Sequence, residues 1–236
     1  MEQFMASTNN NDKLSPPLYN SRIIRIFVVF IKKHYPEINI DSVLGYAGIG
    51  THDVEEPGLW FTQDQVDRFH EALVTKTGNE DIAREAGQFA ASSEGMGPAK
   101  QYTLGLMSLT ALYLSMGKVY AFMSRGADIK TKKIGTNKVE IISTPRPGVN
   151  EKPYQCKNRI GTFESVARLF TKKFAKIEHS SCFHKGGNSC RYIITWENTP
   201  SHIWKLVRNW SLLLSIFSSI VLLFLLPVMS WITFTL

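Results

Sequence analysis

Apolar residues recur at three- and four-residue spacing along the first half of the chain, a pattern typical of helices that bury one face. Thr62 suits the N-cap of one such segment, and Gly78 suits its end. The five helices expected from this pattern cover residues 23–31, 40–49, with Asp41 as the cap, 63–77, 80–93 and 98–124.

After Gly126 the pattern changes to alternation, which is typical of strands. A Gly/Asn turn at 135–138 separates two predicted strands, 129–135 and 139–144. A helix over 159–173 follows, and two further strands, 174–182 and 190–197, flank Gly186 and Gly187. The predicted fold is α+β, with helices packed on a four-stranded antiparallel sheet.

The C-terminal stretch 210–236 contains no charged residue, and about 20 apolar residues suffice for a membrane span. Lys205 and Arg208 precede it, which favours a single pass through the inner membrane with residues 1–202 in the cytoplasm. The expected division of the chain is a disordered arm (1–21), one folded domain (22–198), a linker (199–209) and a transmembrane helix (210–236).

The net charge of +7 is spread over short lysine runs without interleaved aromatic residues, so a nucleic-acid partner is not expected. A phosphate-binding glycine loop, a nucleophile elbow and an HExxH motif are all missing from the sequence. We therefore expect no catalytic residue and no enzymatic activity.

The three cysteines, Cys156, Cys182 and Cys190, lie within 35 residues of one another, and two of them flank a Gly-Gly turn. Thiolates on the two arms of a hairpin can share a zinc ion with a carboxylate or an imidazole. Residues two or four apart share a face of a strand, so Glu178 is expected to be the fourth ligand beside Cys182. His179 is the alternative if the strand ends or bulges early, and cysteines that only pack the hairpin are the alternative to a metal site.

A site for a small molecule needs an apolar cavity with a few polar groups. Aromatic and apolar residues of the 98–124 helix and of later elements are candidates to line it, and they favour a small apolar or aromatic ligand: Phe89, Tyr102, Leu106, Tyr113, Tyr120, Phe122, Phe163 and Trp196. Haem is not favoured, because a Tyr-x-Ser-x-Arg fingerprint is absent and Tyr120, Ser124 and Arg125 have the wrong spacing for it.

The run from Glu178 to Tyr192, together with Arg84–Phe89, resembles the 4-vinyl reductase domain family over residues 22–198. That resemblance implies a fold shared with Golgi-transport (TRAPP-type) subunits and with phenol-responsive bacterial regulators. In those regulators three Cys and one Glu hold zinc, which implies Cys156, Cys182, Cys190 and Glu178 here. The acidic residue stands four positions before Cys182 instead of three, which is where His179 lies.

The segments KKHYPEINIDSVLGYAGI, WFTQDQVDRFHEAL and KPYQC resemble the N-terminal sensory regions of bacterial membrane-bound adenylate cyclases and histidine kinases. The resemblance implies a zinc-stabilised, membrane-tethered sensory domain without its output domain. Its expected partners are a small ligand, the membrane and a second copy of the chain. A non-catalytic trafficking or assembly adaptor of the TRAPP type is the alternative.

Overall fold

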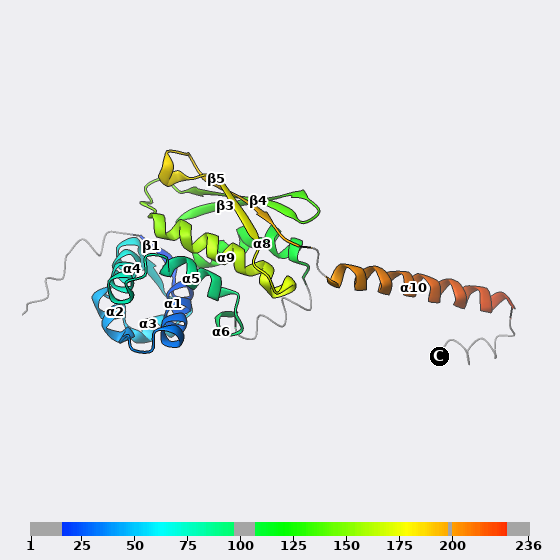
Figure 1. Ribbon diagram of the computed structural model, residues 1–236, viewed down its shortest axis with the longest axis horizontal. Coiled ribbons are helices and arrows are strands. Elements are labelled where there is room, and N and C mark those ends of the chain that lie inside the picture. The colour runs from blue at the N-terminus through cyan, green and yellow to red at the C-terminus, as the bar shows by residue number, and fades with distance from the viewer. Residues whose placement is uncertain (1–15, 97–106, 198–199, 226–236) are drawn as a thin grey trace, which may run out of the picture. The chain divides into compact units, whose positions relative to one another are not determined.

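The computed structural model describes residues 16–96, 107–197 and 200–225. They belong to two compact units, residues 1–196 and 197–236. The N-terminal half of the first unit consists of helices and two short strands that pair with each other (Figure 1). These elements are β1 (Pro17–Asn20), α1 (Ser21–His34), α2 (Ile40–Tyr46), α3 (Thr51–Glu55), β2 (Trp60–Thr62), α4 (Gln63–Thr77), α5 (Ile82–Ala90) and α6 (Ser93–Met96).

Local sequence fixes the ends of the best-predicted helix. The Thr62 side chain accepts a hydrogen bond from the Gln65 backbone, and the Gln65 side chain accepts one from the Thr62 backbone, so α4 begins with a capping box. Gly78 ends α4 in the left-handed conformation (φ 65°). Both predictions are confirmed. Asn39 and not Asp41 caps α2, because the Asn39 side chain reaches the Ser42 N–H and Asp41 already lies in the first turn.

The second half contains α8 (Leu109–Met123), β3 (Ala127–Gly135), β4 (Lys138–Pro145), α9 (Pro153–Thr171), β5 (Lys176–Ser181), a short 3₁₀ turn (Phe183–Lys185) and β6 (Cys190–Thr195). The strands form one sheet in the order β3-β4-β6-β5, and every neighbouring pair is antiparallel. The predicted α+β fold with a four-stranded antiparallel sheet is therefore confirmed.

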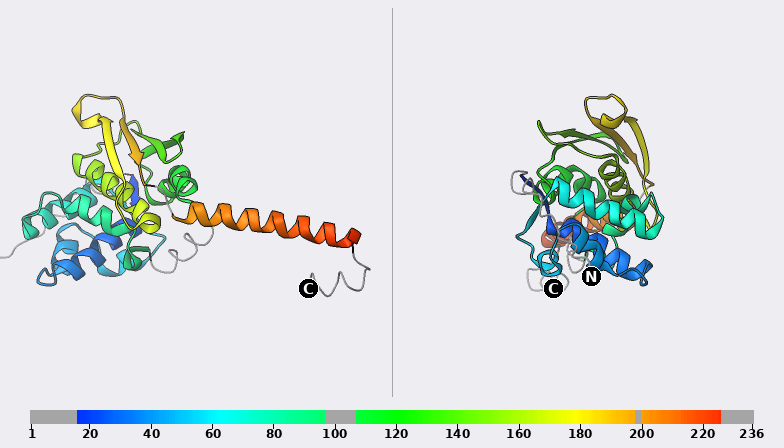
Figure 2. Two further views of the ribbon diagram at one scale, coloured as in Figure 1. Left: turned by 45° about the vertical axis from the view of Figure 1, so that its right-hand side comes forward. Right: turned by 90° about the vertical axis from the view of Figure 1, so that its left-hand side faces the viewer.

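The sheet and the N-terminal helices lie on opposite sides of α8 and α9 (Figures 1 and 2). One core forms between the sheet and helices α8 and α9, where Ile141, Tyr192 and Phe163 are fully buried. A second core fills the N-terminal helical half around Phe69 and Leu73. The site described below lies where the two cores meet.

Some elements differ from the sequence prediction. Residues 17–20, expected to lie in a disordered arm, form β1 and pair with β2, and residues 1–15 lie outside the described part of the chain. The helix α9 begins at Pro153, six residues earlier than predicted, because proline at the first helical position needs no N–H partner. Of the helix expected over 98–124, only the part from Leu109 is described as α8.

The second unit contains α10 (Pro200–Leu225), which includes most of the expected linker. Among the described residues, no helix is both long and apolar enough to cross a membrane. The transmembrane helix predicted for 210–236 is therefore not confirmed, and its last part, 226–236, lies outside the described residues.

Candidate functional site

A cavity of about 40 Å³ lies between the two cores, enough for a few water molecules. Helices α1 and α4 form its apolar wall, and the N-terminal part of α9 forms much of its polar wall. Its lining residues are Tyr19, Ile23, Ile24, Phe27, Val66, Phe69, His70, Tyr120, Ser124, Glu151, Tyr154, Gln155, Asn158 and Arg159.

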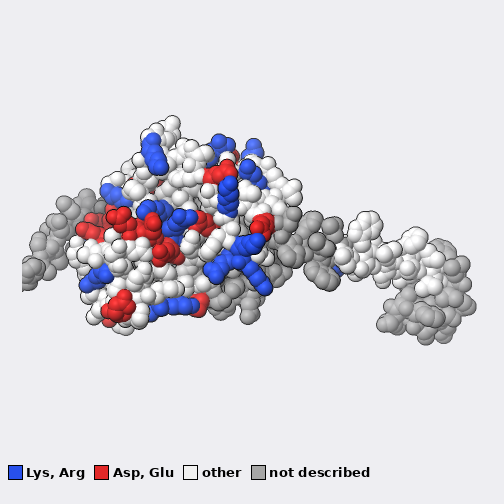
Figure 3. All heavy atoms as spheres, viewed as in Figure 1, with Lys and Arg blue, Asp and Glu red and all other residues white. Residues whose placement is uncertain are grey.

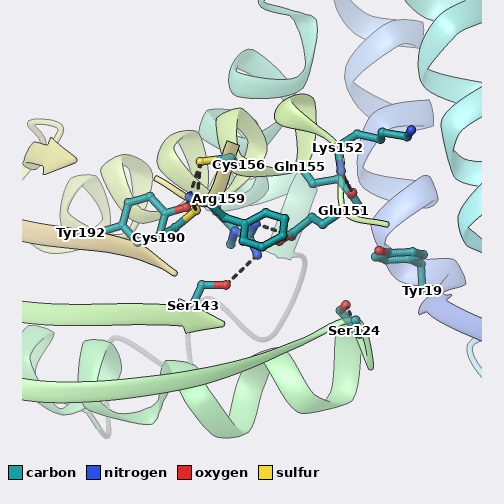
Figure 4. Close-up of polar contacts among 12 residues, drawn as sticks. Tyr19, Ser124, Ser143, Glu151, Lys152, Gln155, Cys156, Arg159, Cys190 and Tyr192 are labelled. Atoms are coloured by element: carbon teal, nitrogen blue, oxygen red, sulfur yellow. Dashed lines mark hydrogen bonds and ion pairs between the residues drawn. The ribbon is translucent and has the colours of Figure 1, made fainter. Parts of the chain in front are cut away.

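The most buried charged side chain of the described residues, Arg159, lies in this wall and is paired with the buried Glu151 (Figure 4). Arg159 is 1% exposed and Glu151 7%, and the Nη2 of Arg159 donates to the Oε1 of Glu151. The Nη1 of Arg159 donates to the Ser143 hydroxyl of β4 at 2.8 Å. The Oε2 of Glu151 and the Nε of Arg159 are buried without a hydrogen-bond partner among the described residues. Buried polar atoms nearly always have a hydrogen-bond partner. The Oε2 of Glu151 and the Nε of Arg159 therefore indicate a partner that is not part of the described chain.

Hydrogen bonds join α4 and α9 beside the cavity. The Tyr154 hydroxyl donates to the Oδ1 of Asp67 at 2.8 Å, and the Nε2 of Gln63 donates to the Oε1 of Gln155 at 3.3 Å. Gln63 also donates to Asp67 at 2.7 Å and accepts a hydrogen bond from the Tyr19 hydroxyl of β1. Burial raises the pKa of Asp67, while the hydrogen bonds from Tyr154 and Gln63 oppose that rise. We call Tyr19, Gln63, Asp67, Tyr154 and Gln155 the polar latch.

His70 of α4 stacks on the ring of Tyr154, with 3.9 Å between ring centroids and 11° between planes. Its Nε2 is buried without a hydrogen-bond partner in the described chain. Burial lowers the pKa of His70 to about 4, and the charge of Lys157 adds to the effect. The cavity is therefore lined by a neutral imidazole at physiological pH.

A second group of reactive side chains lies between α9 and the sheet. The side chains of Cys156, His179, Cys182 and Cys190 each place a ligand atom within 4.8 Å of the others. The Sγ of Cys156 lies 3.9 Å from the Sγ of Cys190, 3.8 Å from the Nε2 of His179 and 3.1 Å from the Tyr192 hydroxyl. We call the three cysteines and His179 the thiol–imidazole cluster. Its composition suits a four-ligand metal site.

Glu178 does not join the cluster. A register irregularity between His179 and Ser181 breaks the strict alternation of β5, so Cys182 lies on the side of His179. His179 stacks on Tyr192 of the neighbouring strand, whereas Glu178 is exposed and lies 3.8 Å from Lys176. The geometry therefore favours His179 over Glu178, although the metal-ligand prediction as a whole stays a prediction.

The thiols of Cys156 and Cys190 interact strongly. The pKa of Cys190 is lowered, first by the hydrogen bond from Cys156 and then by the backbone N–H of Phe183, 3.4 Å away. The pKa of Cys156 is raised, first by the same hydrogen bond and then by burial. If one of the two ionises, it is Cys190.

The residues predicted to contact a ligand are divided among several places. Tyr120 lines the cavity. Tyr113, Phe163 and Trp196 are core residues, and the Tyr113 and Trp196 rings stack at 5.1 Å. Phe89 lines a separate open groove, Phe122 is 71% exposed, and Tyr102 and Leu106 lie outside the described residues.

Sequence reasoning missed Glu151 and Arg159, although a signal for Arg159 was present. Positions 156, 159, 163 and 167 repeat at helical spacing and are otherwise apolar, so an arginine falls on a buried stripe. Glu151 precedes the helix and gives no such pattern. Only the folded chain brings it to Arg159.

Comparison with known proteins gives structural matches alone. No protein-family model matches the sequence, and no match was found among curated proteins. An H-NOX protein from S. oneidensis in the Fe(II)NO ligation state aligns with a TM-score of 0.59 at 14% identity, over 76% of this chain and 99% of that one. An oxygen-binding H-NOX domain related to soluble guanylate cyclases aligns with a TM-score of 0.60 at 17% identity, over 76% and 96%.

A third structure, named for the function of haem distortion in the H-NOX family, aligns with a TM-score of 0.56 at 18% identity, over 76% and 96%. The chain has the H-NOX fold. The resemblance to 4-vinyl reductase and TRAPP-type proteins is thereby corrected, because these aligned structures are H-NOX proteins. The names of two of these structures describe ligand complexes, one with NO and one with oxygen.

The cofactor expectation is corrected as well. Zinc was expected and haem was not, yet the names of proteins with the H-NOX fold refer to haem and to Fe(II). Of the groups that line the cavity, the neutral imidazole of His70 suits haem, whereas the buried Glu151 carboxylate beside Arg159 opposes a haem carboxylate. The cavity volume of about 40 Å³ is far smaller than that of ordinary ligand sites, about 300–1,000 Å³. A haem would enter only after α4 and α9 separate.

Proposed function

We propose that this chain is a small-molecule sensory domain of a signalling protein, with its ligand site in the cavity between the two cores. The observation that carries the proposal is the pair of buried, unpaired atoms on Glu151 and Arg159, opposite the apolar wall of α1 and α4. A few oriented polar groups on an apolar cavity are the ordinary form of a small-molecule site. The H-NOX fold adds support, because its named members bind oxygen or nitric oxide.

Binding would be coupled to the rest of the domain through the polar latch. A ligand larger than a few waters must break the bonds from Tyr154 to Asp67 and from Gln63 to Gln155, which moves the N-terminal end of α9 away from α4. Cys156 lies next to Tyr154 and Gln155 at the start of α9 and contacts Cys190 and Tyr192 of the sheet. A shift of α9 would therefore reach β6 through packed side chains.

The experiment is native purification followed by denaturing extraction and mass spectrometry, with a parallel hemin titration followed by the Soret absorbance. The matched variant is Val66→Phe, which adds volume to the apolar wall at a residue 5% exposed. We expect one small molecule or one haem per wild-type chain and loss of it in the variant, with circular dichroism unchanged. Empty wild-type protein that also leaves the hemin spectrum unchanged would contradict the proposal.

We also propose that the C-terminal segment holds the chain at the inner membrane, with residues 1–202 in the cytoplasm. In α10 the side chains of Trp210, Leu213, Leu214 and Phe217 are all more than half exposed. Exposed apolar area of this extent is typical of a contact with lipid or protein. The test is cell fractionation with an alkaline wash, comparing wild type with Leu213→Asp/Phe217→Asp. Equal extraction of both would contradict membrane insertion.

A further inference from the structure

The unpaired atoms of the cavity wall define the chemistry of the group that would meet them. Glu151 uses Oε1 to bind Arg159, so Oε2 is left as a hydrogen-bond acceptor. Arg159 uses Nη2 for Glu151 and Nη1 for Ser143, so its Nε–H is left as a donor. Two residues that line the cavity and are bound to each other therefore leave one acceptor and one donor unpaired.

The charges of this pair cancel. Glu151 is 7% exposed and Arg159 is 1% exposed, so neither has water to screen an added charge. A carboxylate at this place would be repelled by Glu151, and an ammonium group would be repelled by Arg159. Burying an unpaired charge is also costly, so the pair selects a neutral partner.

We propose that the cavity recognises small neutral molecules with a hydroxyl group on an apolar body. This inference rests on the proposed function of the cavity as the ligand site. One hydroxyl satisfies both atoms, because it donates to the Oε2 of Glu151 and accepts from the Nε–H of Arg159. The apolar body lies against Ile24, Phe27 and Phe69, which are buried on the opposite wall.

The hydroxyl head group decides which molecules of similar shape bind the cavity. An analogue without the hydroxyl leaves both buried atoms unpaired, and sites built to bind a hydroxyl reject such analogues strongly. A charged analogue meets the like charge of one partner. The apolar part has the same shape in all of these analogues, so it does not distinguish one from another.

The test compares four probes of one shape: benzyl alcohol, toluene, benzoate and benzylammonium. Binding to the full chain is followed by ¹H–¹⁵N chemical-shift titration. We expect benzyl alcohol to bind at least tenfold more tightly than each of the other three. Its contact with the cavity is confirmed by shifts of the Asn158 and Arg159 amides, which belong to the lining.

The control is the double variant Glu151→Leu/Arg159→Met, because replacing both partners of a buried pair by apolar residues preserves folding more often than replacing one. In this variant toluene should bind at least as tightly as benzyl alcohol. Equal affinity of the two probes in the wild type would overturn the head-group inference and leave the cavity as a ligand site.

Two further outcomes separate this inference from the proposed function. If no probe binds while a small molecule co-purifies with the chain, the hydroxyl class is wrong and the site stands. If no probe binds, nothing co-purifies and a crystal shows only water on Glu151 and Arg159, both the inference and the proposed function are wrong.

Discussion

Gly161 of α9 lies directly against the backbone of Arg84 in α5. A Cβ at Gly161 would be 2.0 Å from the Arg84 carbonyl oxygen, and one at Gly87 would be 2.3 Å from the Asn158 carbonyl oxygen. The two helices therefore meet backbone to backbone where the helical half joins the rest of the domain. Around this contact Arg84 and Gln88 both donate to Glu164, and Lys157 pairs with Asp81 at 2.7 Å.

Positive and negative side chains also alternate on the face of the domain shown in Figure 3. Ion pairs of the described chain include Arg84 with Glu164 and Arg25 with Glu55 at 3.2 Å. This face accordingly has the charge of a solvated surface, and it does not present a uniform basic area to a nucleic acid.

Gly161→Ala should destabilise the domain by about 2–3 kcal/mol or more, because backbone atoms on the facing helix cannot move aside as a flexible side chain could. The control is Gly45→Ala in α2, where nothing lies within 4 Å of the added Cβ and helix propensity should give a gain of about 0.5–1 kcal/mol. Urea unfolding measures both. Changes of the same sign and size would show that the α5–α9 contact is not as close as described.

Arg159→Met alone should destabilise the domain by about 3–5 kcal/mol, because it leaves the Glu151 carboxylate buried without its partner. Arg146→Met is the matched control, since its pair with Asp128 is exposed and contributes about 1 kcal/mol at most. Both values come from the free energy of unfolding in urea. A loss below about 1 kcal/mol for Arg159→Met would mean that water already reaches Glu151.

Stability should fall as the pH drops from about 6.5 to 4. The pKa of His70 is lowered to about 4 in the folded chain, so over this range the unfolded chain binds a proton that the folded chain does not. The neutral His70 imidazole contributes its full stabilisation above the pKa that it has in the unfolded chain. About 2–3 kcal/mol of the free energy of unfolding is lost by pH 4. His70→Phe keeps a ring on Tyr154 and should remove this part of the pH dependence. Identical pH profiles for the two proteins would rule out a buried neutral histidine.

The metal-ligand prediction can be tested on two adjacent residues. His179→Ala should abolish any bound metal ion, because the imidazole lies within 4.8 Å of the three thiols, whereas Glu178→Ala should retain it. Elemental analysis of chains purified without a metal-binding tag measures the content. Metal loss with Glu178→Ala, or wild-type protein without metal, would refute the set with His179 as fourth ligand.

The sequence by itself determined the local structure of this protein. The helix after Thr62, its end at Gly78 and the hairpin of β3 and β4 follow from capping residues and hydrophobic period, which act over a few positions. The approach of Cys182 and Cys190 follows from the Gly-Gly turn between their strands.

The tertiary structure decided which side chains meet. A single irregularity in β5 placed His179 beside Cys182, and strict alternation gives no warning of such a bulge. Tyr154 reaches Asp67 only because the N-terminal end of α9 lies beside α4, and Glu151 reaches Arg159 only because the chain before α9 folds back along that helix. Cavities and buried pairs depend on contacts between residues far apart in the chain, whereas sequence pattern reports each segment separately.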